Sequence, residues 1–185
     1  MPRPFFLSLD GLDGTGKSTQ CRLLADWLRA AGHAVTTCID PGGTPLGAQL
    51  RSLVLNHRSE MDRMCEALLF MASRAQLLAE VIRPALASGQ SVISDRFLLA
   101  NIVYQGYAGG LDVERLWEVG RFAAGGLEPD LTIVLDLLPQ QAAARRDAAC
   151  SGGRSSTIVR SGSSPPAAKR PTSHRRSTSS PPAWP

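Results

Sequence analysis

The sequence lacks several features that each mark a particular class of protein. It contains no run of 18 or more apolar residues, so it predicts no membrane-spanning helix and no membrane partner. The apolar run at residues 5–9 is too short for the core of a signal peptide, and a cytoplasmic protein is expected. No C-x-x-C pair occurs, which predicts neither a zinc site nor a disulfide framework. Buried or inert thiols are expected at the four cysteines, Cys21, Cys38, Cys65 and Cys150.

Acidic residues are missing from residues 151–185, which hold five Arg and one Lys. The chain carries a net charge of +4, and subtracting the +6 of this segment leaves −2 for residues 1–150. The positive charge therefore belongs to one terminal segment and is not spread over a folded domain. This distribution argues against a nucleic-acid-binding domain, and no nucleic-acid partner is predicted.

The same C-terminal segment is also poor in apolar and aromatic residues. Residues 151–185 contain ten Ser, six Pro and three Thr, one aromatic residue, Trp184, and no hydrophobic periodicity. Such a composition cannot bury enough apolar surface to offset the entropy of ordering, so residues 150–185 are predicted to be a disordered Ser/Pro/Arg-rich tail. A basic tail that binds nucleic acid or an acidic partner is the alternative. The pattern favours instead a gene read out of frame.

Residues 1–149 have the length and the pattern of a single α/β domain. Short apolar runs alternate with segments of helical periodicity, which predicts a parallel sheet with ligands at the carboxyl ends of its strands. The expected strands are 5–9, 33–39, 91–94 and 131–136, and the expected helices are 17–31, 46–55, 61–87, a run from about 99, 112–124 and 139–149. One face of the long helix, Met64, Leu68, Met71, Ala75, Leu78 and Ile82, is expected in the core.

The first predicted strand leads directly into a phosphate-binding loop. Residues 11–18 match the pattern G-x-x-x-x-G-K-S/T between a strand and a helix, which is the context that gives this motif its meaning. Its glycines allow successive backbone N–H groups to turn inward around phosphate oxygens. Lys17 is expected to reach the β- and γ-phosphates and Ser18 to bind Mg²⁺. The predicted ATP-binding residues are Gly11, Leu12, Asp13, Gly14, Thr15, Gly16, Lys17, Ser18 and Thr19.

A second set of residues could bind a nucleobase and its phosphate. Phe70 and Arg74 stand four apart on the long predicted helix, so a ring and a guanidinium share one face. The alternative for this pair is a core phenylalanine beside a solvated arginine. Asp95 and Arg96 follow a predicted strand and place a carboxylate near Mg²⁺ and a forked cation near a phosphate. Hydrogen-bonding groups follow within two helical turns at Asn101, Tyr104 and Gln105.

Across residues 5 to about 146, the sequence resembles thymidylate kinase, the family that moves the γ-phosphoryl group of ATP onto dTMP. The motifs that carry the resemblance are Asp10-Gly11-Leu12-Asp13-Gly14-Thr15-Gly16-Lys17-Ser18-Thr19-Gln20, Pro41-Gly42-Gly43-Thr44-Pro45-Leu46-Gly47, Phe70 through Arg74, Asp95-Arg96-Phe97 and Tyr104-Gln105-Gly106. The resemblance implies a P-loop NTPase three-layer sandwich, with ATP and dTMP as substrates and Mg²⁺ as cofactor. It also implies a homodimer, as in other members of the family.

The resemblance further implies a role for each substrate-binding residue. Phe70 is expected to stack on thymine and Arg74 to bond its carbonyl, while Asn101 and Gln105 read the edge of the ring. Arg96 is expected on the dTMP phosphate, Asp13 near the 3′-hydroxyl and Tyr104 against the sugar. The expected catalytic residues are Lys17, Asp95 and Arg96, and the expected metal-binding residues are Ser18 and Asp95.

The sequence departs from the family pattern at several positions. Asp10 stands where the family usually has Glu, and Ile39-Asp40 replaces Arg-Glu before the Pro-Gly-Gly turn. Gly14 stands where one branch carries a catalytic arginine, so this chain resembles the branch that supplies it from a lid after the fourth strand. The lid and the last strand are expected to be missing, which leaves Arg145, Arg146 and Arg154 as candidates.

The residues therefore predict transfer of a phosphoryl group from ATP to dTMP, with activity reduced by the loss of the lid. Two alternatives stay open at the level of the sequence. One is a P-loop kinase for another deoxynucleoside or nucleoside monophosphate, which would need different base contacts. The other is a nucleotide-binding remnant without catalytic activity.

Overall fold

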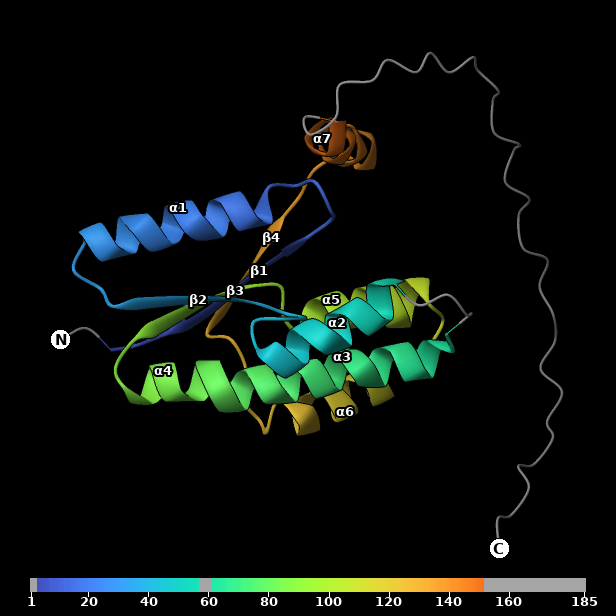
Figure 1. Ribbon diagram of the computed structural model, residues 1–185, viewed down its shortest axis with the longest axis horizontal. Coiled ribbons are helices and arrows are strands. Elements are labelled where there is room, and N and C mark those ends of the chain that lie inside the picture. The colour runs from blue at the N-terminus through green and yellow to red at the C-terminus, as the bar shows by residue number, and fades with distance from the viewer. Residues whose placement is uncertain (1–2, 57–60, 152–185) are drawn as a thin grey trace, which may run out of the picture. The chain divides into compact units, whose positions relative to one another are not determined.

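In the part of the chain that the structure describes, four parallel strands form a sheet in the order β2-β3-β1-β4. The computed structural model, which describes residues 3–56 and 61–151, is shown in Figure 1. The strands are β1 (Phe6–Gly11), β2 (Val35–Ile39), β3 (Ser91–Asp95) and β4 (Leu131–Leu135). The predicted parallel α/β architecture is confirmed, and each strand lies within one or two residues of its predicted position.

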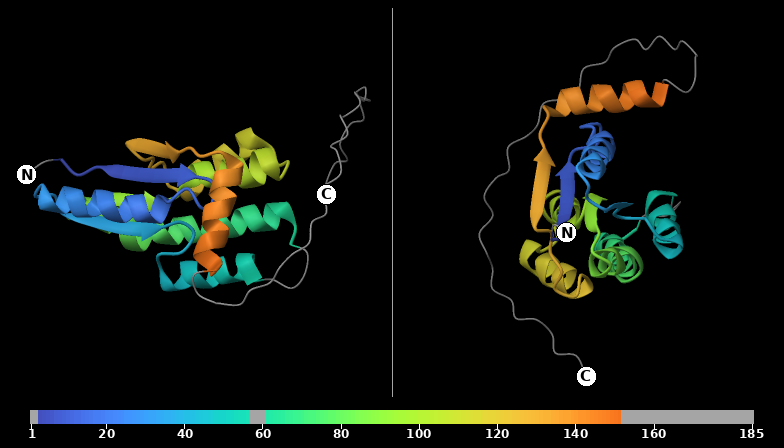
Figure 2. Two further views of the ribbon diagram at one scale, coloured as in Figure 1. Left: turned by 90° about the horizontal axis from the view of Figure 1, so that it is seen from above. Right: turned by 90° about the vertical axis from the view of Figure 1, so that its left-hand side faces the viewer.

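Helices cover both faces of this sheet. Helix α1 lies on one face, while α3 to α6 lie on the other and α2 packs against α3 (Figures 1 and 2). The helices are α1 (Lys17–Ala30), α2 (Pro45–Asn56), α3 (Arg63–Leu77), the π-helix η1 (Leu78–Ile82), α4 (Arg83–Ala87), α5 (Leu98–Asn101), the π-helix η2 (Ile102–Ala108), α6 (Val113–Ala123) and α7 (Pro139–Ser151).

The alternation of side chains along the central strands divides the core into two apolar layers. Phe6 and Val92 point toward α3, α5 and α6, and they pack there with residues such as Met71. Leu9 and Ile93 point to the opposite face and pack against α1. A strand buried on both faces must be apolar at successive positions, which is why the continuous apolar runs in the sequence identified these strands.

The core face of the long helical segment differs from the predicted one. Met71, Leu78 and Ile82 are buried as expected, but Met64, Leu68 and Ala75 are exposed. The buried stripe of α3 instead contains Ala67 and Arg74, each one position before the predicted core residues Leu68 and Ala75. Apolar periodicity misplaced this stripe because a polar residue, Arg74, faces the interior, where it lines a cavity described below.

Three cysteines among the described side chains, Cys21, Cys38 and Cys65, are free thiols with different surroundings. Burial raises the pKa of Cys21 to about 12 and that of Cys38 to about 11, so both thiols are inert as predicted. Cys65 is exposed on α3, so of the two expectations for the cysteines, burial or inertness, burial does not hold for it. The side chain of Cys150 lies outside the described residues.

The part of the chain beyond β4 is described only as far as α7. Within residues 3–56 and 61–151, β4 pairs with β1 and has no strand on its other side. The predicted tail lies outside the described residues from residue 152 onward, and so does Arg154. No helix in the described ranges has the length and hydropathy needed to span a membrane.

Candidate active site

The predicted phosphate-binding loop connects the end of β1 to the start of α1. Gly11 closes the strand with φ +136°, and a Cβ there would lie 2.4 Å from the carbonyl oxygen of Leu135 on the adjacent β4. Gly14 has φ +88°, and a Cβ there would lie 2.1 Å from the carbonyl oxygen of Ala142. Both positions therefore require glycine, because the backbone has a positive φ and because another segment of the same chain lies too close for a Cβ.

Lys17, in the first turn of α1, is folded back over the loop. Its Nζ donates to the carbonyl oxygen of Leu12 at 2.8 Å and lies 3.8 Å from Oδ1 of Asp13. The Thr15 hydroxyl donates to the same carbonyl, so the loop is closed on itself. Burial and the nearby Arg96 guanidinium hold the pKa of Lys17 below its usual value. The ammonium group is thus already positioned inside the loop, where an anion would relieve its poor solvation.

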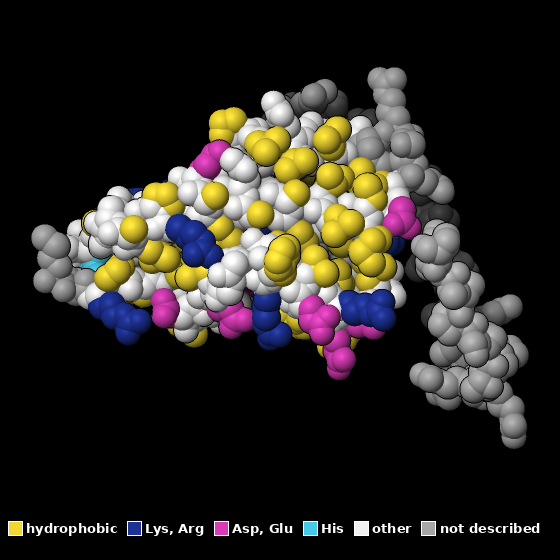
Figure 3. Space-filling view, turned by 90° about the horizontal axis from the view of Figure 1, so that it is seen from below, with side chains coloured by type: hydrophobic (Ala, Val, Ile, Leu, Met, Phe, Trp, Pro, Cys, Tyr) yellow, Lys and Arg dark blue, Asp and Glu magenta, His cyan; other side chains and the backbone are white. Residues whose placement is uncertain are grey.

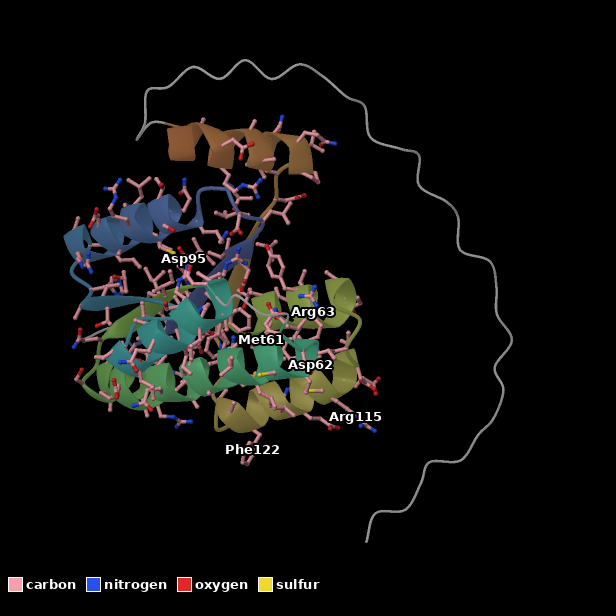
Figure 4. The ribbon with its side chains drawn as sticks, turned by 45° about the vertical axis from the view of Figure 1, so that its right-hand side comes forward. Met61, Asp62, Arg63, Asp95, Arg115 and Phe122 are labelled. Carbon is pink, nitrogen blue, oxygen red and sulfur yellow. The ribbon has the colours of Figure 1, made fainter. Side chains whose placement is uncertain are left out.

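Oxygen donors suited to a hard divalent cation stand where the loop meets β3. The Ser18 hydroxyl donates to Oδ2 of Asp95 at 2.5 Å, and Asp95 lies near the centre of the molecule, at the carboxyl end of β3 (Figure 4). Ser18 and Thr19 are exposed in the first turn of α1. One hydroxyl, one carboxylate and phosphate oxygens are a donor set that Mg²⁺ accepts together with water.

Asp10, the residue before the loop, adds a buried carboxylate at the same edge of the sheet. Both of its carboxyl oxygens are buried and have no hydrogen-bond partner among the described residues. Burial raises the pKa of Asp10 to about 6, against the opposing influence of Arg96. An unpartnered acceptor in this position fits water molecules or a cation held beside Ser18 and Asp95.

All of the predicted substrate-binding residues line one cavity of about 400 Å³. This volume lies in the range of small-molecule sites. The cavity opens between the P-loop, α3 and the α5–η2 segment. The residues in question are Asp13, Phe70, Arg74, Arg96, Asn101, Tyr104 and Gln105. The structure therefore brings together side chains from four separate stretches of the sequence.

Arg74 is buried in the wall of this cavity, which contradicts the alternative of a solvated arginine. It is 2% exposed, and its Nε donates to Oδ2 of Asp40 at 2.5 Å. Its Nη1 donates to Oδ1 of Asn101 at 3.0 Å, and the Asn101 amide donates in turn to Oε1 of Gln105 at 2.7 Å. Phe70 is half-buried at the same cavity, where its ring is available for stacking.

Arg96 has a strained backbone that aims its side chain toward the loop. Its φ of +71° is unusual for a residue with a Cβ, and it comes directly after β3. The guanidinium donates to Oδ1 of Asp13 at 2.5 Å and lies 5.2 Å from the centre of the Tyr104 ring. A forked cation is thereby held between the P-loop and the cavity.

Several residues of the cavity were not identified from the sequence. Asp40 and Arg51 line it, and Arg51 donates to the carbonyl oxygen of Pro41 at 2.8 Å. Arg63 and Glu66 also line it from the beginning of α3, where Figure 4 labels Arg63. For Asp40 a signal was present, since a carboxylate at the end of a parallel strand lies at the edge where ligands bind. Nothing in the sequence singled out the other three.

Helix α7 passes over the P-loop and brings the candidate lid arginines to this side of the molecule. The backbone nitrogen of Arg146 lies 3.2 Å from the position of a Cβ at Gly14. The Arg146 guanidinium is exposed and donates to Asp147 at 3.4 Å. Arg145 is also exposed on the same helix.

Comparisons with known proteins agree with this geometry. The sequence model of the family described as thymidylate kinase matches residues 9–154. The thymidylate kinase of Rhodopirellula baltica is 52% identical over 131 residues, which are 71% of this chain and 54% of that protein. The thymidylate kinase of Deinococcus radiodurans is 47% identical over 139 residues, 75% of this chain and 68% of that protein.

A solved structure shows the same fold. A crystal structure of thymidylate kinase from Ehrlichia chaffeensis superimposes with a TM-score of 0.70 at 31% identity, over 82% of this chain and 89% of that one. The chain spans little more than half the length of the Rhodopirellula relative and about two thirds of the Deinococcus one. With a matching family model over most of its length and a shared fold, the chain belongs to the thymidylate kinase family.

Proposed function

We propose that this chain transfers the γ-phosphoryl group of ATP to dTMP and so produces dTDP. One observation carries the proposal: the residues expected for the base, the sugar and the phosphate of dTMP line a single cavity beside the P-loop. Family membership supports the same substrates. The proposed catalytic unit is residues 1–149.

The P-loop would bind the phosphates of ATP. The roles proposed are backbone N–H groups of residues 11–16 and Lys17 for the phosphates, and Ser18 with Asp95 for Mg²⁺. Bound there, Mg²⁺ would neutralise charge on the β- and γ-phosphates. The loop already holds Lys17 by a single backbone acceptor, the Leu12 carbonyl, so phosphate oxygens can replace that contact with little rearrangement.

The cavity would bind dTMP with its base toward α3. In the proposed arrangement Phe70 stacks on thymine, Arg74 bonds a carbonyl of the ring, and the amides of Asn101 and Gln105 bond its edge. Tyr104 would pack against the deoxyribose, and Asp13 would bond the 3′-hydroxyl. Asp13 is the more exposed partner of its ion pair with Arg96, at 64% against 15%, which leaves its carboxylate accessible to a ligand.

Arg96 would hold the dTMP phosphate in line with the γ-phosphate. A phosphate acceptor is already ionised, so the transfer depends on alignment and charge neutralisation and requires no strong base. An arginine that neutralises the transition state contributes about 10³–10⁵ in rate. Since Gly14 cannot do so, Arg145 and Arg146 on α7 are the proposed substitutes, and slow turnover is expected.

A coupled assay of ATP consumption tests the proposal. The wild-type chain is expected to consume ATP with dTMP and not with dCMP or AMP, and Lys17→Met is expected to abolish turnover. Calorimetric titration of dTMP adds a readout that slow turnover does not affect. Specific binding of dTMP without any turnover would identify a nucleotide-binding remnant, and turnover with another monophosphate would identify a different kinase.

A homodimer is also part of the proposal. Large apolar side chains are exposed on α2, α3 and α6, and Figure 3 shows hydrophobic side chains gathered over the face formed by the lower helices of Figure 1. The set consists of Leu53, Met64, Leu68, Val119 and Phe122. Sedimentation velocity would detect the dimer. The cytoplasmic location and the absence of a nucleic-acid partner stay predictions from the sequence.

A further inference from the structure

A chain of buried hydrogen bonds begins at Asp40, a residue to which the resemblance assigns no role. Asp40 follows β2 directly and is 1% exposed, and Arg74 is 2% exposed. The 2.5 Å contact between Oδ2 of Asp40 and Nε of Arg74 joins two residues that are 34 positions apart. Burial raises the pKa of the Asp40 carboxyl, and the Arg74 guanidinium acts against it. Arginine stays charged in proteins, so its buried guanidinium needs this counter-charge.

The contact with Asp40 leaves Arg74 little freedom to rotate. Nε is held by the carboxylate, Nη1 by the Asn101 oxygen and by the sulfur of Met71, and Nη2 by the carbonyl oxygen of Phe97 at 3.4 Å. The guanidinium carbon also lies 5.4 Å from the centre of the Phe97 ring. With one edge fixed by an ionic hydrogen bond, the remaining N–H groups have defined directions.

The orientation of the next two amides follows from the chemistry of Arg74. A guanidinium only donates, so Asn101 must turn its oxygen toward Arg74. Its nitrogen then faces Gln105, whose oxygen accepts this bond at 2.7 Å. Gln105 therefore has its own amide nitrogen left for a ligand. Oδ2 of Asp40 and the side-chain oxygens of Asn101 and Gln105 each accept a bond within this chain, whereas Oδ1 of Asp40 is buried without a partner among the described residues.

We propose that Asp40 is a positioning residue for the base: by fixing Arg74, and through it the amides of Asn101 and Gln105, it makes the base end of the cavity a set of N–H donors. Such a set accepts a ring with a carbonyl group, as in thymine, and disfavours a ring that carries an amino group at that place, as in cytosine. This inference rests on the proposed function, since it assumes that dTMP occupies the cavity. It adds a residue that acts through Arg74 and need not touch the nucleotide.

Calorimetric titration of the full chain with dTMP, dCMP and ATP provides the test. Asp40→Asn keeps the shape of the side chain and removes its charge. It is expected to weaken dTMP binding by about 10- to 100-fold, the range for a hydrogen bond to a charged group, and to narrow the preference for dTMP over dCMP. The affinity for ATP is expected to stay unchanged. Asp40→Glu keeps the carboxylate and is expected to restore much of the dTMP affinity.

Two further variants distinguish the positioning of Arg74 by Asp40 from a general loss of stability. Asp112→Ala removes the N-terminal cap of α6, away from the cavity, and is expected to lower the melting temperature without changing dTMP affinity. Asp40→Asn is also made in the background of Arg74→Ala. If Asp40 acts through Arg74, the double variant binds dTMP no more weakly than Arg74→Ala alone, and this comparison stands even where Asp40→Asn alone fails to fold.

The outcomes distinguish the inference from the function on which it rests. Equal affinity of wild type and Asp40→Asn for dTMP overturns the inference and leaves the proposed function in place. Weaker dTMP binding by the double variant than by Arg74→Ala alone has the same consequence, because Asp40 would then act on the ligand by a route other than Arg74. A wild-type chain that binds ATP but not dTMP overturns the proposed function, and the inference with it.

Discussion

Two phenylalanines on neighbouring helices show how placement decides the role of a residue. Phe70 lines the cavity beside Arg74, whereas Phe122 on α6 is 88% exposed and points away from the body of the molecule (Figure 4). Their side chains are chemically identical. Phe70→Ala and Phe122→Ala therefore form a matched pair in which only the surroundings differ.

Phe70→Ala is expected to weaken dTMP binding by about 1–3 kcal/mol, the usual loss when a base loses an aromatic partner, and to leave ATP binding unchanged. Phe122→Ala is expected to change neither. Titration of each variant with both nucleotides measures this. If Phe70→Ala lost the same amount of binding affinity for dTMP as for ATP, the result would indicate a general disturbance of α3 and would contradict a base site at Phe70.

Asp10 gives a second prediction at the scale of one residue. Its pKa of about 6 in the folded protein exceeds the ordinary value of 3.8, so between these values the folded state holds a proton that the unfolded state has released. The contribution of Asp10 to stability is therefore greatest below pH 4 and falls as the pH rises to about 6. The difference of roughly two pKa units corresponds to about 3 kcal/mol at neutral pH.

Asp10→Asn removes this penalty. In the absence of nucleotide and Mg²⁺, the variant is expected to be more stable than wild type by about 2–3 kcal/mol at pH 7.5 and nearly equal to it at pH 4. Urea denaturation at the two pH values measures both differences. If Asp10→Asn gained the same stability at pH 4 as at pH 7.5, the ionisation of Asp10 would not be the cause of the gain.

At the scale of elements, the P-loop and α7 share one constraint at Gly14. The loop needs a positive φ there, and α7 lies so close that a Cβ would meet the Ala142 carbonyl oxygen. Gly32, after α1, has nearly the same φ of +89° but nothing within 4 Å of the Cβ position. Replacing each with alanine separates backbone strain from displacement of α7.

Gly32→Ala is expected to lower stability by about 1–2 kcal/mol, the strain of a left-handed residue with a Cβ. Gly14→Ala is expected to add a clash that moves α7 off the loop, with faster hydrogen exchange in residues 139–148 and weaker ATP binding. Hydrogen-exchange mass spectrometry compares the two variants. Unchanged exchange in α7 of Gly14→Ala would show that the helix does not depend on this contact.

At the scale of the whole molecule, β4 is the strand whose surroundings are least complete within the described residues. β4 pairs only with β1 in residues 3–56 and 61–151, and its residues Leu131 and Val134 are 53% and 58% exposed. Unpaired backbone groups together with exposed apolar side chains favour association between molecules.

Leu131→Lys is expected to reduce association at high concentration, because a charge on an edge strand opposes pairing. The stability of the monomer is expected to change by less than about 0.5 kcal/mol, as for other exposed sites. Leu23→Lys on α1 is the control, since Leu23 is 47% exposed on a helix and not on an edge strand of the sheet. Light scattering across a concentration series measures association. An equal reduction in both variants would mean that added charge acts without regard to the strand edge.

The sequence by itself determined what depends on neighbouring residues. The P-loop was predictable because its glycines, Lys17 and Ser18 act within one turn of chain, and the strands were predictable because burial on both faces leaves continuous apolar runs. The seven substrate-binding residues predicted from the motifs all line the cavity, whereas Arg51, Arg63 and Glu66 lie there without any signal in the sequence. The exposure of Met64 and Leu68 could not be predicted from the sequence. Apolar periodicity alone does not show which side of a helix faces the interior when an arginine lies on the buried side.

Only the tertiary structure decided the contacts between distant parts of the chain. Asp40 meets Arg74 across 34 residues, and α7 meets Gly14 from the far end of the described chain. Neither contact leaves a local pattern, since each requires the sheet to place the end of one element against another. The physical reason is that a buried charge or a close backbone approach is defined by its surroundings, and these exist only after the strands and helices have packed.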